Sequence, residues 1–306
     1  MVEFISQTLG LVWREQWALQ NFFDGLGELF TGGGARGIAA TFMMVMQMFN
    51  MLATGASVDP WGPELDLTGY ELVFEDEFEG DALNMNIWRP SGDGSSRAGY
   101  SSINQVSVAD GALSMKGEYL TDGVYGEGWY GASIALRETY TRGYFECRMI
   151  AADSNSFWSA FWLNGVQSSI NHETSKGGIE SVEIDVMESL SHSKEGKHNS
   201  IEHAIHLAGL NGSTEGYQSR NLGAFNGNDI YNKYNTYGLK WTEEEYIFYI
   251  NGVETVRSTF GEGICINPEV VLISLCVPSA VKFEGKSLDE TCEMKVDYVR
   301  IYQLAE

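Results

Sequence analysis

The chain has 306 residues, of which 42 are acidic and 19 are basic, so its formal net charge at pH 7 is −23. This excess argues against a nucleic-acid partner, and it would slow capture of a polyanionic substrate unless basic side chains line the binding site. The four cysteines are too few to act as a disulfide framework for a chain of this length, and none shows the Cys-x-x-Cys spacing of a metal or redox site.

The first 60 residues differ in kind from the rest. Apolar residues recur there at near-helical spacing, and residues 38–54 form an uncharged, methionine-rich run of marginal length for a bilayer. A signal-peptide core is one interpretation, but the acidic residues before the run disfavour it. We expect residues 1–60 to form a helical N-terminal segment that packs on the rest of the chain or lies on a membrane.

Residues 61–306 form a second unit, which the linker VDPWGPELD joins to the first. Short runs with period-two alternation, separated by Gly, Asn, Asp and Ser, are typical of an all-β sandwich or barrel. Residues 246–250 alternate, Asn251-Gly252 is a pair favoured in type I′ turns, and residues 253–256 provide a return strand. We therefore predict one domain of two packed antiparallel sheets.

The cysteines of this unit fall in two kinds of context. Cys147 alternates with apolar residues and is most simply a buried thiol. Cys265 and Cys292 lie in loop-like stretches and could pair with each other.

The run Glu183-Ile184-Asp185-Val186-Met187-Glu188 places three carboxylates on an apolar strand. Side chains alternate along a strand, so Glu183 and Asp185 share one face while Glu188, by parity, should face the core. A β-bulge at Val186-Met187 would return Glu188 to the carboxylate face and avoid the cost of an unpaired buried charge.

With that bulge, the two glutamate Cα atoms would lie roughly 13 Å apart at about 3.3 Å per residue. Their carboxyl groups could then approach to about 5 to 6 Å, which is the separation typical of a retaining glycosidase. Asp185 lies between them and could separate their pKa values. The alternatives are a calcium site or a solvated edge strand.

The run resembles the E-[ILV]-D-x-x-E motif that members of glycoside hydrolase family 16 carry on a bulged strand. The resemblance covers about residues 70–303 and is supported by further blocks in the family's order. These blocks are LVFEDEFEGDALNMNIW, VADGALSMKGEY, TRGYFECRMIAADSNSFWSAFWLNG, NTYGLKWTEEEYIFYINGVE and MKVDYVRIYQ. The resemblance implies a jelly-roll β-sandwich with a concave substrate cleft, in which Glu183 is the nucleophile, Glu188 the acid/base and Asp185 the orienting residue.

Further residues are candidates for the cleft. Alternation sends Trp158 and Trp162 to one face, where indole rings could stack on sugars, and Trp129 is a third such candidate. Core packing is the alternative for each. Arg97 lies in a polar loop that could overhang a cleft and contact sugar hydroxyls. His206 matches the position at which the family often has a cleft histidine, whereas His203 points to the opposite face and is expected to be structural.

The resemblance also implies a structural calcium site at Asp297, together with the Glu77 region, although Asp297 could equally be an ordinary end-of-strand charge. We expect no cofactor to be required.

The sequence thus predicts an endo-acting retaining β-glycosidase that hydrolyses a polysaccharide. A β-1,3- or β-1,3-1,4-glucan is the first choice of substrate, and a β-galactan or host O-glycan is the second. A non-catalytic carbohydrate-binding jelly roll is the alternative from another class, which the three carboxylates disfavour because binding needs no acid/base pair. We expect a secreted or cell-surface monomer.

Overall fold

The computed structural model describes residues 57–165, 177–190, 192, 198–207, 218–261, 263–277 and 279–305. These residues form strands and short 3-10 turns, and the described part of the chain holds no α-helix. The predicted all-β fold is therefore confirmed.

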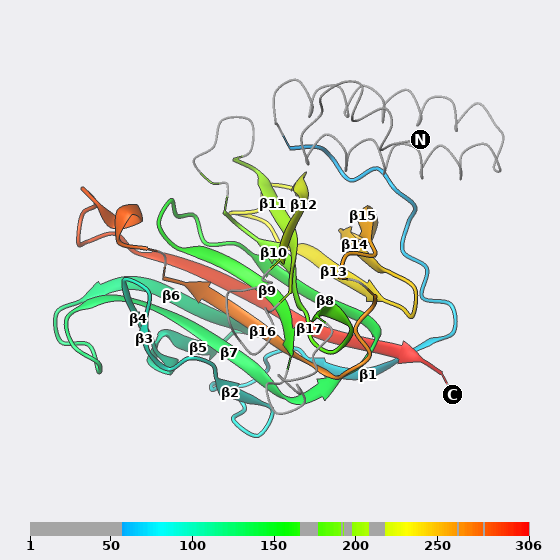
Figure 1. Cartoon of the computed structure of the whole chain (residues 1–306). Coiled ribbons are helices and arrows are strands. Elements are labelled where there is room, and N and C mark those ends of the chain that lie inside the picture. Colours follow the sequence, from blue (N-terminus) through cyan, green and yellow to red (C-terminus); the bar gives the residue numbers. More distant parts are fainter. Residues whose placement is uncertain are drawn as a thin grey trace, which may run out of the picture.

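The strands follow one another along the chain as shown in Figure 1. They are β1 (Tyr70–Asp76), β2 (Trp88–Pro90), β3 (Gly94–Ser96), β4 (Gly99–Ser101), β5 (Val106–Ala109), β6 (Ala112–Leu120), β7 (Gly128–Tyr140), β8 (Gly143–Ile150), β9 (Trp158–Gly165), β10 (Glu183–Glu188), β11 (Ser200–Leu207), β12 (Gln218–Asn226), β13 (Asn235–Trp241), β14 (Tyr246–Ile250), β15 (Val253–Ser258), β16 (Glu269–Cys276) and β17 (Cys292–Leu304). The 3-10 turns are η1 (Ile103–Gln105), η3 (Gly177–Ile179) and η5 (Ala280–Phe283).

Two antiparallel sheets make up the sandwich. Sheet A runs in the order β2, β7, β16, β9, β10, β11, β12. Sheet B runs β15, β14, β13, β8, β17, and both β1 and β6 pair with β17. Strand β7 also pairs with β6 and β4, which links the sheets along one edge. This arrangement matches the predicted jelly-roll sandwich.

The core lies between the two sheets because each strand turns its apolar residues toward the other sheet. Ile184 on β10 and Phe161 on β9 meet residues such as Phe145 and Leu239 of sheet B in one continuous cluster. Burial of this apolar surface drives the packing of the sheets. The opposite face of sheet A is left to carry polar side chains.

The predicted hairpin turn at Asn251-Gly252 is confirmed. Both residues have positive φ, 51° and 76°, and they join β14 to β15. The left-handed conformation at both positions is the one that a type I′ turn requires. The Asn251 side chain also accepts a hydrogen bond from the backbone N–H of Thr236, which ties the turn to β13.

The predictions for the N-terminal segment concern residues that lie mostly outside the described ones. Of the linker, Val58 is buried and pairs with Phe225 of β12, while Glu64 forms a bridge to Val253. The linker thus packs along the sandwich. The described part of the chain contains no helix with the length and apolarity that a membrane crossing requires.

All four cysteines are free in the structure. Cys147 is fully buried, as predicted. Cys292 belongs to β17 and Cys265 contacts the carboxyl group of Glu269, so the suggested pairing of Cys265 with Cys292 is wrong.

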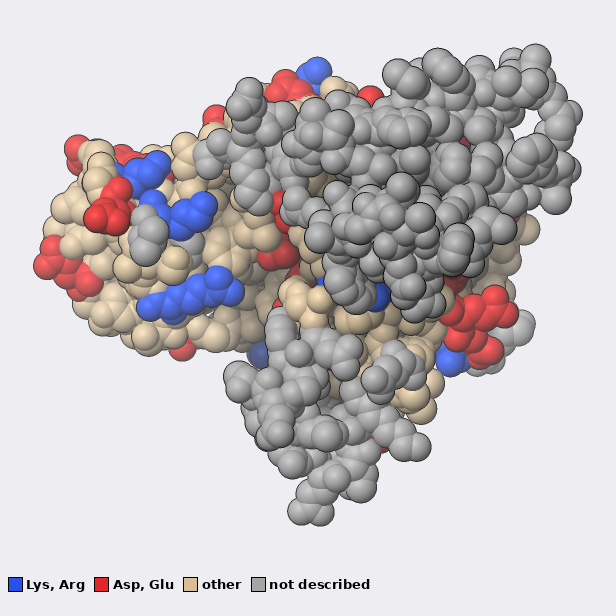
Figure 2. Space-filling model, turned by 45° about the horizontal axis from the view of Figure 1, so that its top comes forward, with Lys and Arg blue, Asp and Glu red and all other residues tan. Residues whose placement is uncertain are grey.

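The negative charge is not spread evenly over the surface. Figure 2 shows several basic side chains gathered toward one end of the face in view, while acidic side chains occur at its edges and near its centre. The net charge alone therefore does not describe the field that a ligand meets.

Candidate active site

The β-bulge predicted at Val186-Met187 is present in β10. Asp185 pairs with Ala204 of β11 and Glu188 with Glu202, so two residues of β10 lie opposite His203. The pairing of β10 with β9 shifts at the same place. Because the bulge restores the parity of the strand, Glu183, Asp185 and Glu188 all reach the outer face of sheet A.

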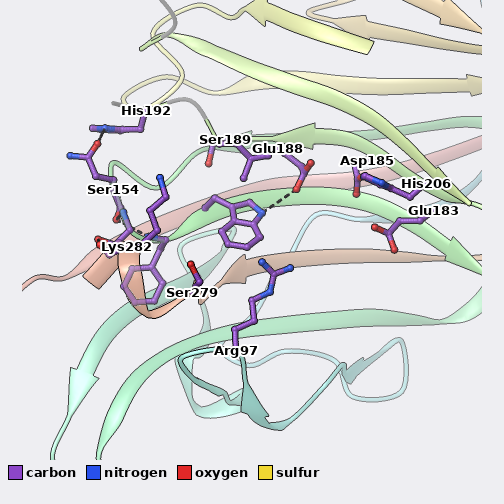
Figure 3. A pocket seen from close by; sticks show the side chains of 15 residues that line it. Arg97, Ser154, Glu183, Asp185, Glu188, Ser189, His192, His206, Ser279 and Lys282 are labelled. Atoms are coloured by element: carbon purple, nitrogen blue, oxygen red, sulfur yellow. Dashed lines mark hydrogen bonds and ion pairs between the residues drawn. The ribbon is translucent and has the colours of Figure 1, made fainter. Parts of the chain in front are cut away.

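A cleft of about 450 Å³ lies over this face, and all three carboxylates line it. Figure 3 shows Glu183, Asp185 and His206 together at one side and Glu188 between them and the remainder of the cleft. The lining continues with Arg97, Ser154, Asn155, Ser156, Phe157, Trp158, Ser189, Leu190, His192, Ser279 and Lys282. A cleft of this size suits part of a sugar chain.

Asp185 is held by its neighbour on β11. Its carboxylate lies 3.0 Å from Nε2 of His206, and only 5% of the residue is exposed. Glu183 lies directly opposite His206 in the sheet, and its carboxylate accepts a hydrogen bond of 3.1 Å from the side-chain amide of Asn164. Asn164 was not among the predicted site residues, although the alternation of β9, extended by two residues from Trp162, places it on this face.

Glu188 has a different neighbour. The Nε1–H of Trp158 donates a hydrogen bond of 3.2 Å to its carboxylate. The guanidinium of Arg97 lies 4.4 Å from the centre of the Trp158 ring, at the distance of a cation–π contact. Arg97 reaches this place from the turn between β3 and β4, where its own φ is 51°.

These surroundings shift the pKa values of the three carboxyl groups. Burial, reinforced by the charge of Asp185, raises the pKa of Glu188 to about 8. Burial and Asp185 also raise the pKa of Glu183, against the opposing effect of His206 and Arg97. Burial raises the pKa of Asp185 as well, although His206 opposes it. Glu188 can therefore hold a proton at neutral pH, as an acid catalyst must.

His206 responds to the same charges. Burial by itself lowers the pKa of His206, but the hydrogen bond to Asp185 and the charges of the carboxylates outweigh burial, so the pKa is raised. The imidazole can thus stay cationic beside Asp185 when the latter is ionised. His206 lines the cleft, and its contact with substrate stays a prediction.

The three predicted tryptophans have different surroundings. Trp158 lines the cleft. Trp162 lies opposite Asp185 on the same face and donates through Nε1 to Ser274, but it is not part of the cleft lining, so its contact with substrate stays a prediction. Trp129 is only 7% exposed and stacks on Phe283 at 4.3 Å between ring centres. The prediction that Trp129 binds substrate is therefore wrong, because its ring packs within the core.

The residues suggested for calcium do not fit a cation site. Asp297 forms an ion pair with Arg148, and Glu77 forms one with Arg300, so each carboxylate faces a guanidinium. Among the described residues, the group with metal-ligand geometry is Glu183, Asp185 and His206, whose ligand atoms lie within 4.8 Å of one another. The calcium prediction at Asp297 is not supported.

Two residues at the far end of the cleft were also not among the predicted site residues. Lys282 lies in η5, and His192 lies beyond β10 with its ring against Asp153 and Asn155. Both line the cleft (Figure 3). No sequence pattern marks these residues, because the packing of η5 against the sandwich brings Lys282 to the site and contacts with Asp153 and Asn155 place His192 there.

Comparison with known proteins identifies the family. The family model described as the GH16 domain of β-porphyranases A–D matches residues 72–304. The chain belongs to this GH16 family. The match spans sheets A and B and includes the bulged strand, so the resemblance predicted from the sequence is confirmed.

Curated relatives of this GH16 domain are two proteins of Rhizobium meliloti (strain 1021). Endo-1,3-1,4-beta-glycanase ExsH is 26% identical over 210 residues, and Endo-1,3-1,4-beta-glycanase EglC is 27% identical over 209 residues. Each alignment covers 66% of this chain, and the chain spans 40% of the length of each relative.

Among solved structures, LamAcat from Zobellia galactanivorans is similar with a TM-score of 0.61 at 20% identity. The similarity covers 76% of this chain and 97% of LamAcat. At this identity the likeness shows the fold, a GH16 β-sandwich.

Proposed function

We propose that this GH16 domain is an endo-acting retaining β-glycosidase. The observation that carries the proposal is the bulge at Val186-Met187, which brings Glu183 and Glu188 to one open cleft with Asp185 between them. Two carboxyl groups that flank a substrate at short range can form and hydrolyse a glycosyl-enzyme ester, which is the retaining mechanism. An open cleft, unlike a closed pocket, accommodates the interior of a polymer.

The three carboxyl groups have different roles in this mechanism. Glu188, whose pKa of about 8 keeps it protonated at neutral pH, donates its proton to the leaving glycosidic oxygen. Glu183 attacks the anomeric carbon and forms the ester. The Glu188 carboxylate then takes a proton from the water that attacks the ester, which releases Glu183 and restores the protonated acid. Asp185, held by His206, lies beside Glu183 on the same strand face and orients it.

Substitution of the two glutamates tests these roles. Glu183→Gln and Glu188→Gln should each lower kcat by at least about 10²-fold, because each step of the double displacement needs one of them. Azide should rescue turnover in both variants. The azide product of Glu188→Gln should keep the configuration of the substrate, and that of Glu183→Gln should be inverted. Undiminished hydrolysis by either variant would contradict the assignment.

A β-1,3- or β-1,3-1,4-glucan is the first candidate substrate. The names of ExsH and EglC describe endo-1,3-1,4-beta-glycanases, and this supports a neutral β-glucan for the present chain. The strong negative charge of the chain also favours an uncharged polymer. A substrate of polymer size supports our proposal that the enzyme acts outside the cell or at its surface.

A galactan with anionic groups is the second candidate, and a specific observation favours it. Arg97 and Lys282 both line the cleft that holds the carboxylates, so two basic side chains face a bound substrate despite the overall charge (Figure 3). Guanidinium and ammonium groups bind sulfate or carboxylate substituents. The family model that matches the chain is described as a β-porphyranase domain, so porphyran belongs among the substrates to be tested.

A substrate comparison separates the candidates. Product analysis on laminarin, lichenan, agarose, porphyran, carrageenan and mucin glycans should show cleavage of one class. If the substrate is anionic, Lys282→Ala should raise KM and weaken its dependence on salt, because one ionic contact is lost. Lys295→Ala, on β17 and outside the cleft lining, is the matched control. If the enzyme cleaves only neutral glucans and Lys282→Ala leaves KM unchanged, an anionic galactan is excluded as the substrate.

A further inference from the structure

His203 is a fully buried histidine that lies directly opposite the catalytic bulge. The pairs Asp185–Ala204 and Glu188–Glu202 leave His203 as the single residue of β11 that faces both Val186 and Met187. Its side chain points into the core, away from the cleft, and its exposed fraction is 0%. A polar ring in such a place requires hydrogen-bond partners for both nitrogens.

Both ring nitrogens of His203 have partners. Nδ1 lies 2.6 Å from the carbonyl oxygen of Val186, and Nε2 lies 3.0 Å from Oγ1 of Thr255. Burial lowers the pKa of His203 to about 3, so the ring is neutral and carries one N–H. Because a carbonyl can only accept, Nδ1 carries the hydrogen and donates it to Val186, so Nε2 is an acceptor. The Thr255 hydroxyl, whose Oγ1 also lies 3.1 Å from the carbonyl oxygen of Phe248, shares its one hydrogen between that oxygen and Nε2.

The two partners of His203 lie at irregularities of the sheets. Val186 is part of the bulge of β10, and Thr255 is the extra residue where the pairing of β15 with β14 shifts. The pairing of β11 with β12 also shifts directly after His203. A bulge leaves backbone groups without ladder partners, so a side chain that reaches them can fix where the bulge occurs.

The ring itself is held firmly. It packs between Phe225 and Phe248, with ring centres 5.2 Å and 4.8 Å away. Phe225 belongs to sheet A and Phe248 to sheet B, so the imidazole that bonds to β10 also packs against the opposite sheet.

We propose that His203 is a positioning residue for catalysis: its Nδ1–H holds the Val186 carbonyl at the bulge and thereby sets the relative positions of Glu183 and Glu188. The proposal rests on the proposed function for the roles of the two glutamates. If the bulge relaxed, Glu188 would turn toward the core by strand parity, and the acid/base would leave the cleft. His203 thus acts from the core face on a reaction that takes place on the other face.

The experiment compares four variants of the whole chain. His203→Leu removes both hydrogen bonds, and Thr255→Val removes the hydroxyl that orients the ring without changing the size of the side chain. His203→Asn keeps an N–H donor close to the position of Nδ1. Val256→Ala is the matched control, because it destabilises the same strand, β15, at a buried apolar residue and leaves the hydrogen bonds of His203 intact.

Two measurements are made on each variant. The first gives kcat and KM on the polysaccharide that the wild type cleaves. The second is the titration of the Glu188 carboxyl group, followed by carbon NMR of glutamate-labelled protein and assigned by the signal that Glu188→Gln removes. This titration reports the position of Glu188 whether or not the protein turns over substrate.

We expect His203→Leu and Thr255→Val to lower kcat by about 10- to 100-fold with KM changed by less than about threefold, since misplacement of a catalytic group affects the chemical step. The Glu188 titration should move in both variants. His203→Asn should recover most of kcat, and Val256→Ala should lose stability while keeping both the wild-type titration and the wild-type kcat.

Wild-type titration and kcat in folded Thr255→Val or His203→Leu would overturn the proposal, as would equal losses in Val256→Ala. If the titration moves in the His203 and Thr255 variants while the wild-type protein cleaves no polysaccharide, the positioning role holds and the proposed function fails. The two hypotheses are therefore tested separately.

Discussion

At the scale of single residues, the two glutamates differ in what surrounds them. Glu188 accepts a hydrogen bond from Trp158, while Glu183 accepts one from Asn164 and lies close to His206. The pKa of Glu188 is raised to about 8 by burial and by Asp185. Two carboxyl groups with distinct environments can serve as acid and nucleophile in one site.

The alkaline side of the pH–activity profile follows from Glu188. Below about pH 8 it is protonated and can donate to the leaving oxygen, and above that pH it is ionised and cannot. We expect kcat/KM to fall as the pH rises through about 8. In Glu188→Gln with azide, the limb assigned to Glu188 should disappear. A profile that is identical in wild type and rescued variant would contradict the role of Glu188.

Trp158 should tune that pKa. Its N–H favours the ionised form of Glu188, so Trp158→Phe, which removes the donor, should shift the alkaline limb to higher pH and lower kcat by about tenfold. Trp162→Phe is the matched control, because its N–H donates to Ser274 and not to a carboxylate. The pH profiles of both variants test this prediction, which fails if the two shift alike.

At the scale of elements, η5 places Lys282 in the cleft because its last residue, Phe283, packs on Trp129. Phe283 stacks on Trp129 at an interplanar angle of 7°, and it also packs edge-on against Phe157. The carbonyl of Lys282 accepts a hydrogen bond from Ser156. Trp129 therefore supports the cleft indirectly, through the turn that packs on it.

Loss of this anchor should affect binding more than chemistry. Phe283→Ala removes most of a buried ring, so it should destabilise the fold by about 2 to 4 kcal/mol and raise KM with little change in kcat. Leu288→Ala, at a side chain 55% exposed, is the control and should change neither quantity. Steady-state kinetics and thermal unfolding measure both effects. A fall in kcat at unchanged KM would contradict this account of η5.

At the scale of the whole molecule, buried carboxyl groups link stability to pH. Burial raises the pKa of Glu269 to about 8, as it does for Glu188. Glu269 is fully buried at the start of β16 and accepts from Cys265 and from the backbone of Val182. Between about pH 4.5 and pH 8 the folded protein holds protons that the unfolded chain has lost, so stability falls as the pH rises.

Glu269→Gln tests this dependence away from the catalytic site. The variant cannot ionise at this position, whereas the wild-type carboxyl group is neutral at pH 5 and becomes a buried charge at pH 8.5. The Tm of the variant should therefore exceed that of the wild type by several °C at pH 8.5 and differ little from it at pH 5. Glu71→Gln, on the exposed side of β1, is the control. Equal Tm differences at pH 5 and pH 8.5 would show that ionisation of Glu269 does not contribute.

Local patterns sufficed for much of the fold and of the site. Alternation marked β9, β11 and β14, the Asn251-Gly252 pair marked its turn, and the parity of Glu183 and Glu188 required the bulge that β10 contains. Contacts made by distant loops could not be predicted in this way. Trp129 shows the same alternation as a cleft residue, yet the ring of Phe283 covers it.

The sequence by itself determined that the chain folds as an all-β sandwich and that three carboxylates share one strand face, because both follow from side-chain alternation and backbone parity over a few residues. Only the tertiary structure decided which groups tune those carboxylates. Burial, the placement of Trp158 and Arg97, and the bond from His203 to the bulge depend on residues far apart in the chain, which no local pattern relates.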